Sequence, residues 1–171
     1  AMSAFSHLHI GELGTLEENP DLVDHARRCG MTISLDCGWQ DEFRPEVRDL
    51  IAAVDVFLPN QREFEALLAI GVPETCAALT VVKNGKAGAR ARKLRQSEWV
   101  HEATKPLRVV DATGAGDAFN GGFISQWLKG ASLQLCLQRG NACGAASVQS
   151  AGGVGGLAGV VDGQLAEPSF H

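Results

Sequence analysis

Residues 111–123 read Asp-Ala-Thr-Gly-Ala-Gly-Asp-Ala-Phe-Asn-Gly-Gly-Phe, the most informative stretch of this chain. The apolar pair at 109–110 indicates a strand before it. Phe119, Phe123 and Trp127 are spaced four apart and indicate a helix face after it. The glycines therefore lie at a strand-to-helix turn, where the backbone can approach a ligand closely and the helix start attracts negative charge. The sequence predicts a phosphate site at this turn.

Asp117 is unexpected at a phosphate site, because a carboxylate repels a bound anion. A chemical task would explain it: the carboxylate can accept the proton of a substrate hydroxyl as that oxygen attacks a γ-phosphate. General base catalysis typically contributes about 10²–10⁴ in rate, and phosphoryl transfer otherwise depends on positioning and charge stabilisation. The alternative is a first-turn acid that the helix dipole stabilises by about 0.3–1 kcal/mol. Spacing alone leaves both interpretations open.

Strands alternate with helices along the rest of the chain. Apolar runs predict strands at 7–10, 31–36, 54–58 and 80–83, with a polar loop from 11 to 20. Helical spacing predicts helices from 21 to 30, from Pro45, through Phe64–Leu68, and as two segments separated by Gly130 between 114 and 149. Short antiparallel strands are expected between 89 and 110. The pattern predicts an α/β fold, a Rossmann-type, largely parallel sheet flanked by helices.

In such a sheet, ligands bind beyond the carboxyl ends of the strands. We therefore expect Asp36, Asn60, Gly85 and Asp111 to face a common edge, because each comes directly after a predicted strand or close to its end. The pair Gly121-Gly122, on the helix that follows the turn, predicts close helix packing.

Composition narrows the class of protein. The 171 residues are 45% hydrophobic and 20% charged, which is typical of a globular domain. A formal net charge of −5 disfavours nucleic acid or an anionic membrane as a partner. Five cysteines without a C-x-x-C pair indicate reduced thiols, and hence a cytoplasmic protein.

The run D-x-T-G-A-G-D-A-F-x-x-G-F resembles the second signature of the PfkB carbohydrate kinases, also called the ribokinase family. The resemblance implies a ribokinase-like fold and ATP-dependent phosphorylation of a sugar hydroxyl. In that family the turn forms the anion hole over the transferred phosphate, and its aspartate is the catalytic base. By position, these roles carry over to Gly114, Ala115, Gly116 and Asp117. Ala112 departs from the family, which often has threonine there.

Two earlier segments resemble the same family, in the same order. Asn60-Gln61-Arg62-Glu63 resembles its N-x-x-E motif, which helps to place Mg²⁺ and the phosphates, with Glu63 acting indirectly on the metal. Taken alone, this segment also fits a helix start with Asn60 as N-cap and Glu63 completing a capping box. Lys83-Asn84-Gly85-Lys86-Ala87-Gly88 resembles a nucleotide-contacting segment, although a hairpin turn fits the bare pattern equally well.

Three more residues complete the site that the resemblance implies. Asn141 matches an asparagine near the adenine pocket, and Thr113 belongs to the phosphate-binding turn. Asp111 falls where some members bind a monovalent cation. The implied cofactors are therefore ATP and Mg²⁺, with K⁺ as a further candidate ion.

The resemblance runs from about Phe5 to Leu157 but covers only the later part of the family pattern. We therefore expect residues 1–171 to be the carboxyl-terminal, nucleotide-binding portion of a ribokinase-like domain, truncated at the N-terminal side and without the substrate and lid section. The chain would supply the ATP site, anion hole and base, with ATP and a small sugar as partners and a homodimer as a further expectation. The alternative is a non-catalytic nucleotide-binding or subunit-interaction fragment.

Overall fold

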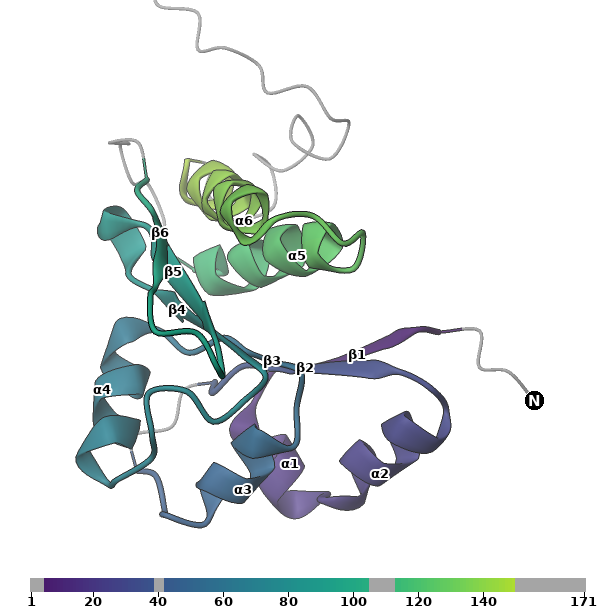
Figure 1. Cartoon of the computed structure of the whole chain (residues 1–171). Coiled ribbons are helices and arrows are strands. Elements are labelled where there is room, and N and C mark those ends of the chain that lie inside the picture. The colour runs from purple at the N-terminus through teal and green to yellow at the C-terminus, as the bar shows by residue number, and fades with distance from the viewer. Residues whose placement is uncertain (1–4, 39–41, 105–112, 150–171) are drawn as a thin grey trace, which may run out of the picture. The chain divides into compact units, whose positions relative to one another are not determined.

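The computed structural model describes residues 5–38, 42–104 and 113–149. The chain divides into two compact units (Figure 1). The first unit runs to Asn84 and includes Arg90–Val100, and the second comprises Gly85–Ala89 and the residues from His101 onward. Each unit is described by itself below.

Six strands form one mixed sheet in chain order, namely β1 (His7–Ile10), β2 (Thr32–Leu35), β3 (Val56–Phe57), β4 (Leu79–Lys83), β5 (Ala89–Lys93) and β6 (Val100–Glu102). The strands β1 to β4 are parallel: His7 pairs with Thr32, Ser34 with Val56, and Val56 with Leu79. The predicted parallel sheet is confirmed for these four strands.

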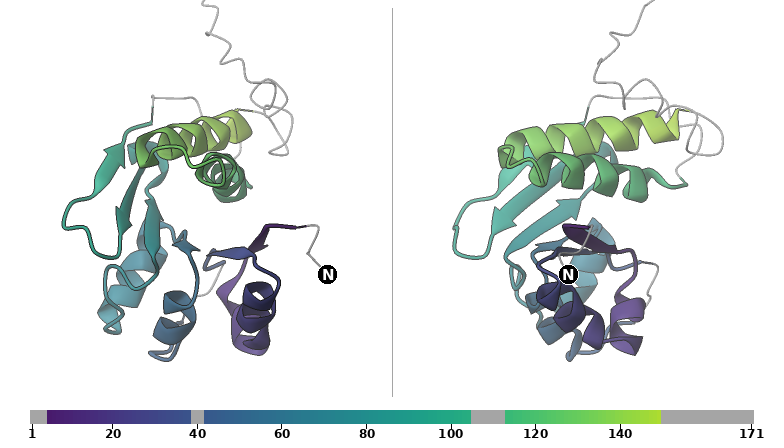
Figure 2. Two further views of the ribbon diagram at one scale, coloured as in Figure 1. Left: turned by 45° about the vertical axis from the view of Figure 1, so that its right-hand side comes forward. Right: turned by 90° about the vertical axis from the view of Figure 1, so that its right-hand side faces the viewer.

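Helices connect the parallel strands. They are α1 (Leu13–Glu18) and α2 (Asp21–Arg28) before β2, α3 (Val47–Ala52) before β3 and α4 (Gln61–Ala69) before β4. Parallel crossovers are almost always right-handed, so strands paired in chain order place every connecting helix on the same face. Figures 1 and 2 show α1 to α4 together on one side of these strands. That arrangement leaves the carboxyl ends of the strands at a single edge.

The core of the first unit lies between these helices and the strands. Ile33 and Leu35 of β2 are fully buried against Leu13, Leu16, Ala26 and Ile51 of the helices. The α1 helix contradicts the polar loop expected at 11–20. Leu13 and Leu16 fill the core one turn apart, but α1 has only six residues and no side-chain N-cap bond, so the usual start signal is missing.

The second unit contains α5 (Ala115–Trp127) and α6 (Leu133–Val148), which pack against each other. A Cβ at Gly122 would lie 2.8 Å from the Arg139 carbonyl oxygen, and one at Gly140 would lie 2.7 Å from the Phe119 ring. The prediction of close packing is confirmed for Gly122. It is wrong for Gly121, which faces open space. The strand predicted at 109–110 lies outside the described residues. In the described part of the chain no helix has the length and apolar character of a membrane span.

Gly88 provides the first testable prediction. Its φ is +93°, and a Cβ there would lie 2.0 Å from the Glu102 carbonyl oxygen. Gly71 has a similar φ of +87° but has open space around it. We expect Gly71→Ala to lower the free energy of unfolding by about 1–2 kcal/mol through backbone strain alone. Gly88→Ala should cost at least about 1–3 kcal/mol more, because the clash is with backbone that cannot rotate away. Equal losses in chemical denaturation would contradict this assignment.

Candidate functional site

Five polar residues gather where the parallel strands of the first unit end. We call them the strand-end cluster: Asp36, Cys37, Asn60, Glu63 and Lys83. Asp36 and Cys37 follow β2, Lys83 ends β4, and Asn60 precedes α4, which carries Glu63. Asn60 forms a parallel bridge with Lys83, whose backbone N–H donates to the Pro59 carbonyl at 2.9 Å. The sequence prediction that Asp36 and Asn60 share one edge is confirmed.

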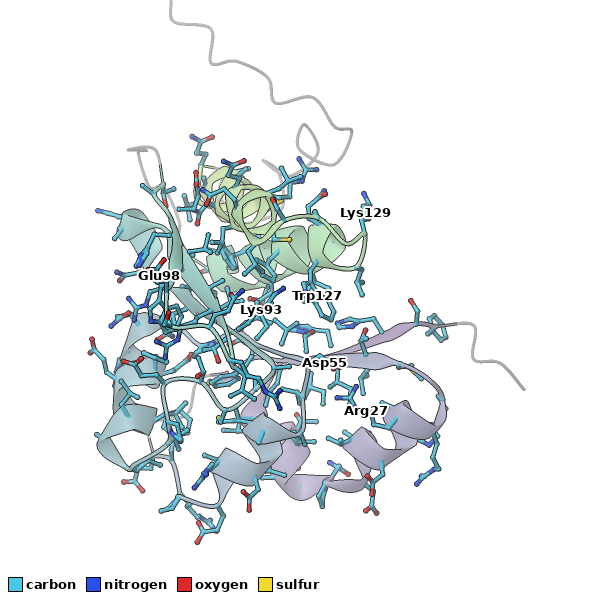
Figure 3. The ribbon with its side chains drawn as sticks, viewed as in Figure 1. Arg27, Asp55, Lys93, Glu98, Trp127 and Lys129 are labelled. Carbon is cyan, nitrogen blue, oxygen red and sulfur yellow. The ribbon has the colours of Figure 1, made fainter. Side chains whose placement is uncertain are left out.

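A buried ion pair lies at the centre of this cluster. The Lys83 Nζ donates to Asp36 Oδ2, and the two side chains are only 12% and 10% exposed. The other carboxylate oxygen, Oδ1, accepts the backbone N–H of Cys37 at 2.7 Å. Lys83 therefore carries its charge into a largely buried position because Asp36 compensates it. A different ion pair, Arg27 to Asp55 at 2.6 Å, lies at the amino ends of β2 and β3 (Figure 3).

Asn60 and Glu63 form the capping box that their spacing suggests. Asn60 Oδ1 accepts the Glu63 N–H at 2.9 Å, and Glu63 Oε2 accepts the Asn60 N–H at 2.8 Å. The local alternative is thus confirmed, and it is compatible with a binding role because a carboxylate has further lone pairs. The capping box fixes the position of the Glu63 carboxylate relative to the helix start.

Burial shifts two ionisation equilibria in the cluster. Partial burial raises the pKa of the Glu63 carboxyl, and nearby Asp36 adds to this effect, while the Asn60 N–H and Lys83 oppose it. Burial also raises the pKa of the Cys37 thiol well above its usual value, with the Glu63 and Asp36 carboxylates contributing in the same direction. At neutral pH Cys37 is therefore a protonated thiol and a hydrogen-bond donor.

The carboxylates of this cluster suit a particular kind of metal ion. Within residues 5–38, 42–104 and 113–149, no group of three or more His, Cys, Asp or Glu side chains forms a complete metal cage. Mg²⁺ does not need such a cage: it keeps several waters and is held by one or two carboxylates together with substrate phosphates. The carboxylates of Asp36 and Glu63 are of the ligand type that Mg²⁺ uses in such sites.

The glycine turn lies in the second unit. Gly114 has a φ of +76° and is the N-cap residue of α5; its carbonyl accepts the Ala118 N–H at 2.9 Å. Ala115, Gly116 and Asp117 form the first turn, whose N–H groups have no partner within the helix. Asp117 is exposed there, and Thr113 precedes the turn. The predicted anion-hole residues and the predicted base thus share one helix start. Asp111 lies outside the described residues.

The remaining predicted residues of the second unit surround one short backbone segment, 102–104. Asn141 is buried on α6 and donates from Nδ2 to the Glu102 carbonyl at 3.1 Å. Gly85 accepts at its carbonyl from Thr104 Oγ1 at 3.3 Å and from the Gly88 N–H at 3.0 Å. The sequence did not predict a role for this segment, because the pattern of residues 89–110 indicates only short strands. Asn141 has half of its amide committed to the backbone of this segment.

Comparisons with known proteins identify the family of this chain. A model of the pfkB family carbohydrate kinases matches residues 7–157. The chain belongs to this family. It is 35% identical over 172 residues to a 2-dehydro-3-deoxygluconokinase of Bacillus subtilis strain 168, covering 88% of this chain and 53% of that protein. It is also 35% identical over 148 residues to an ATP-dependent ribose-1-phosphate kinase of Halopiger xanaduensis, covering 81% and 47%.

Solved structures give the same result for the fold. A putative Ribokinase II from E. coli in its apo form superposes with a TM-score of 0.72 at 27% identity, covering 90% of this chain and 56% of that one. A structure of putative Ribokinase II in complex with ATP and Mg²⁺ superposes with a TM-score of 0.67 at 27% identity, covering 85% and 53%. The ribokinase-like fold is therefore confirmed. The chain spans about half the length of the curated relatives it matches.

The buried ion pair yields a stability prediction. Asp36→Asn would leave the Lys83 charge buried without its carboxylate, and we expect the free energy of unfolding to fall by about 3 kcal/mol. The matched control is Glu74→Gln, which breaks the 2.6 Å pair with Arg92 at a carboxylate that is 51% exposed. That change should cost less than about 1 kcal/mol. A similar, small loss for both variants in denaturant titrations would show that Asp36 is not needed to compensate Lys83.

The raised pKa of Glu63 predicts a pH dependence. The folded protein holds this proton more tightly than the unfolded chain, whose glutamates titrate near about 4.3. The stability that comes from this tighter proton binding is therefore fully present below that pH. It is lost as the pH rises through the higher pKa of the folded state. We expect Glu63→Gln, which can still accept the capping bond, to remove this decline. Denaturation curves of both proteins between about pH 4 and 7 measure it; parallel pH profiles would refute the assignment.

Proposed function

We propose that this chain supplies the ATP site, anion hole and catalytic base of an ATP-dependent kinase that phosphorylates a sugar hydroxyl. One observation carries the proposal: an exposed carboxylate, Asp117, lies in the first turn of α5 directly after the glycine turn. An acid that only stabilises a helix start needs no glycine turn. A base for phosphoryl transfer needs its carboxylate beside a turn whose backbone N–H groups can bind the phosphate. Membership in the pfkB family supports the same reading.

Asp117 would accept the proton of the sugar hydroxyl. As the sugar hydroxyl oxygen bonds to the γ-phosphorus of ATP, the bond between that phosphorus and the β–γ bridging oxygen breaks, and ADP leaves. The backbone N–H groups of Gly114, Ala115 and Gly116 would donate hydrogen bonds to the transferred phosphoryl oxygens. These donors are held by the helix start itself, so no reorganisation is needed when charge develops. Their contribution is electrostatic and that of Asp117 is proton transfer.

We assign phosphate and Mg²⁺ placement to Asn60, Glu63 and Lys83 of the strand-end cluster, and nucleotide contacts to Gly85, Gly88, Thr113 and Asn141. Bound Mg²⁺ would neutralise phosphate charge, and the ATP and Mg²⁺ in the related putative Ribokinase II support this pairing. Asp111 is the candidate for a monovalent cation such as K⁺.

A single substitution tests the base. Asp117→Asn keeps the size and the helix position but cannot accept the proton, so kcat should fall by about 10²–10⁴ while ATP affinity is retained. The matched control is Asp49→Asn, which removes an exposed first-turn acid of α3. It should leave kcat unchanged. Assays use the full-length protein, a panel of sugars and calorimetry with ATP and Mg²⁺.

Two results would count against the proposal. Unchanged turnover in Asp117→Asn would exclude Asp117 as the base. Binding of ATP and Mg²⁺ without turnover on any sugar would favour the alternative, a non-catalytic nucleotide-binding fragment.

A further inference from the structure

The two histidines of β1 share one face of the sheet, because residues two apart on a strand point the same way. Both reach the same hydroxyl on the neighbouring strand β2. His7 Nε2 lies 2.8 Å from Ser34 Oγ, and His9 Nδ1 lies 2.8 Å from the same oxygen, which belongs to a fully buried residue. The other ring nitrogen of His7, Nδ1, lies 2.7 Å from Thr32 Oγ1. Neither the motifs nor the proposed function assign a task to these four side chains.

Counting protons gives this chain of hydrogen bonds a direction. The Thr32 hydroxyl donates to the Ser6 carbonyl at 3.3 Å, because a carbonyl can only accept. The Thr32 oxygen then accepts from His7 Nδ1–H, so the second nitrogen of this neutral ring accepts the Ser34 proton. The Ser34 hydroxyl has no other proton, and its oxygen therefore accepts from His9 Nδ1–H. The network thus assigns the Nδ1–H form to both neutral histidines.

One additional proton fits this network, whereas two do not. His9 is exposed, and a proton on its Nε2 leaves every bond of the chain in place. A proton on His7 Nε2 turns that nitrogen into a donor, so the Ser34 hydroxyl has to donate to His9 Nδ1 instead, which requires a neutral His9. When both rings are charged, two N–H groups point at one buried oxygen and the Ser34 proton loses both imidazole acceptors. Leaving a buried donor without its acceptor is costly.

The surroundings of His7 also disfavour its charged form. Partial burial lowers the pKa of His7, and the neighbouring His9 lowers it further, while Asp55 at the start of β3 raises it. The Asp55 carboxylate opposes the other two effects only in part. It is engaged elsewhere, by Arg27 Nη1 of α2 at 2.6 Å and by the Ile33 N–H at 2.7 Å. A second proton is therefore held more easily when the strands have separated and water can solvate the imidazolium.

We propose that Ser34 limits this histidine pair to one bound proton and thereby makes the pairing of β1 with β2 sensitive to acid. Uptake of the second proton breaks the bonds to Ser34 and favours a state in which β1 has separated from β2. Among the described strands, β1 pairs with β2 alone. The pairing ends beside the strand-end cluster, where the Asp36 N–H donates to the Ile10 carbonyl at 2.9 Å. The inference does not depend on the proposed function.

Hydrogen exchange of two amides in the full chain measures this opening. The Thr32 and Asp36 N–H groups donate to carbonyls at the two ends of the β1 segment, at 3.0 and 2.9 Å. If one imidazole of the pair titrates near about 6.5 only in the open state, opening is about 30-fold more favourable at pH 5 than at pH 8. Protection is therefore full above about pH 6.5 and falls as the pH drops below it.

We expect the protection factors of Thr32 and Asp36 to fall about 10–30-fold from pH 8 to pH 5. The Leu79 amide, which donates to the Asp55 carbonyl at 2.9 Å between β4 and β3, should keep its value. Ring ¹⁵N spectra of the same protein report the protonation of each histidine and test the Nδ1–H assignment.

Three variants identify the groups responsible. His7→Gln can still accept the Ser34 proton but cannot titrate, so the acid-dependent loss of protection should disappear. The matched control is His101→Gln, at an exposed histidine on strand β6, which should keep the wild-type loss. Ser34→Ala removes the shared hydroxyl, and the ring ¹⁵N signals should then show His7 becoming protonated at a higher pH than in the wild type.

Three results would overturn the inference. Ring signals that show both histidines protonated while the Thr32 and Asp36 amides stay protected would exclude a limit of one proton. A His7→Gln variant with the pH dependence of the wild type would assign the loss of protection to another group. A parallel loss at the Leu79 amide would mean that acid destabilises the whole sheet and does not act on the β1–β2 pairing.

Discussion

The parallel pairing of β1 to β4 is the constraint on which the first unit depends. Strands that run the same way and pair in chain order must end at the same edge, and their connecting helices must then cover one face. Residues far apart in the sequence, such as Asp36, Asn60 and Lys83, meet there without any direct pattern linking them. The direction of the strands, more than any single motif, therefore brings together the side chains of the candidate nucleotide site in this unit.

That convergence has an electrostatic consequence. Asp36 lies close enough to Glu63 to raise the pKa of the Glu63 carboxyl, and Lys83, which is paired with Asp36, opposes this effect. Lys83 is already paired with Asp36, so an incoming phosphate would compete with that carboxylate for the ammonium group. Under the proposed function, a divalent cation brought by the nucleotide would relieve this competition, because it would offer the carboxylates a positive charge in place of Lys83.

Sequence patterns predicted elements well where periodicity and strand burial agree. The runs at 7–10, 31–36 and 80–83 contain most or all of the strands β1, β2 and β4, whose apolar residues are largely buried. The α1 helix could not be predicted because no local sequence signal marks it. It is stabilised by tertiary contacts, since Leu13 and Leu16 are buried in the core. At the site, spacing revealed the capping box, whereas the Lys83–Asp36 pair joins residues 47 positions apart.

The phosphate contacts proposed for the two units are of different kinds. Those of the strand-end cluster come from polar and charged side chains, whose geometry depends on neighbours from other elements. The turn at Gly114 uses backbone N–H groups of one helix start, whose geometry is local and is set by a φ of +76°. Substitutions should therefore act differently in the two places. In the cluster a conservative replacement can preserve a charge or a donor, whereas at Gly114 any side chain must adopt a left-handed conformation that costs about 1–2 kcal/mol. The effect of a replacement in the cluster therefore depends on the charge or donor that it keeps, whereas the effect at Gly114 depends on backbone conformation.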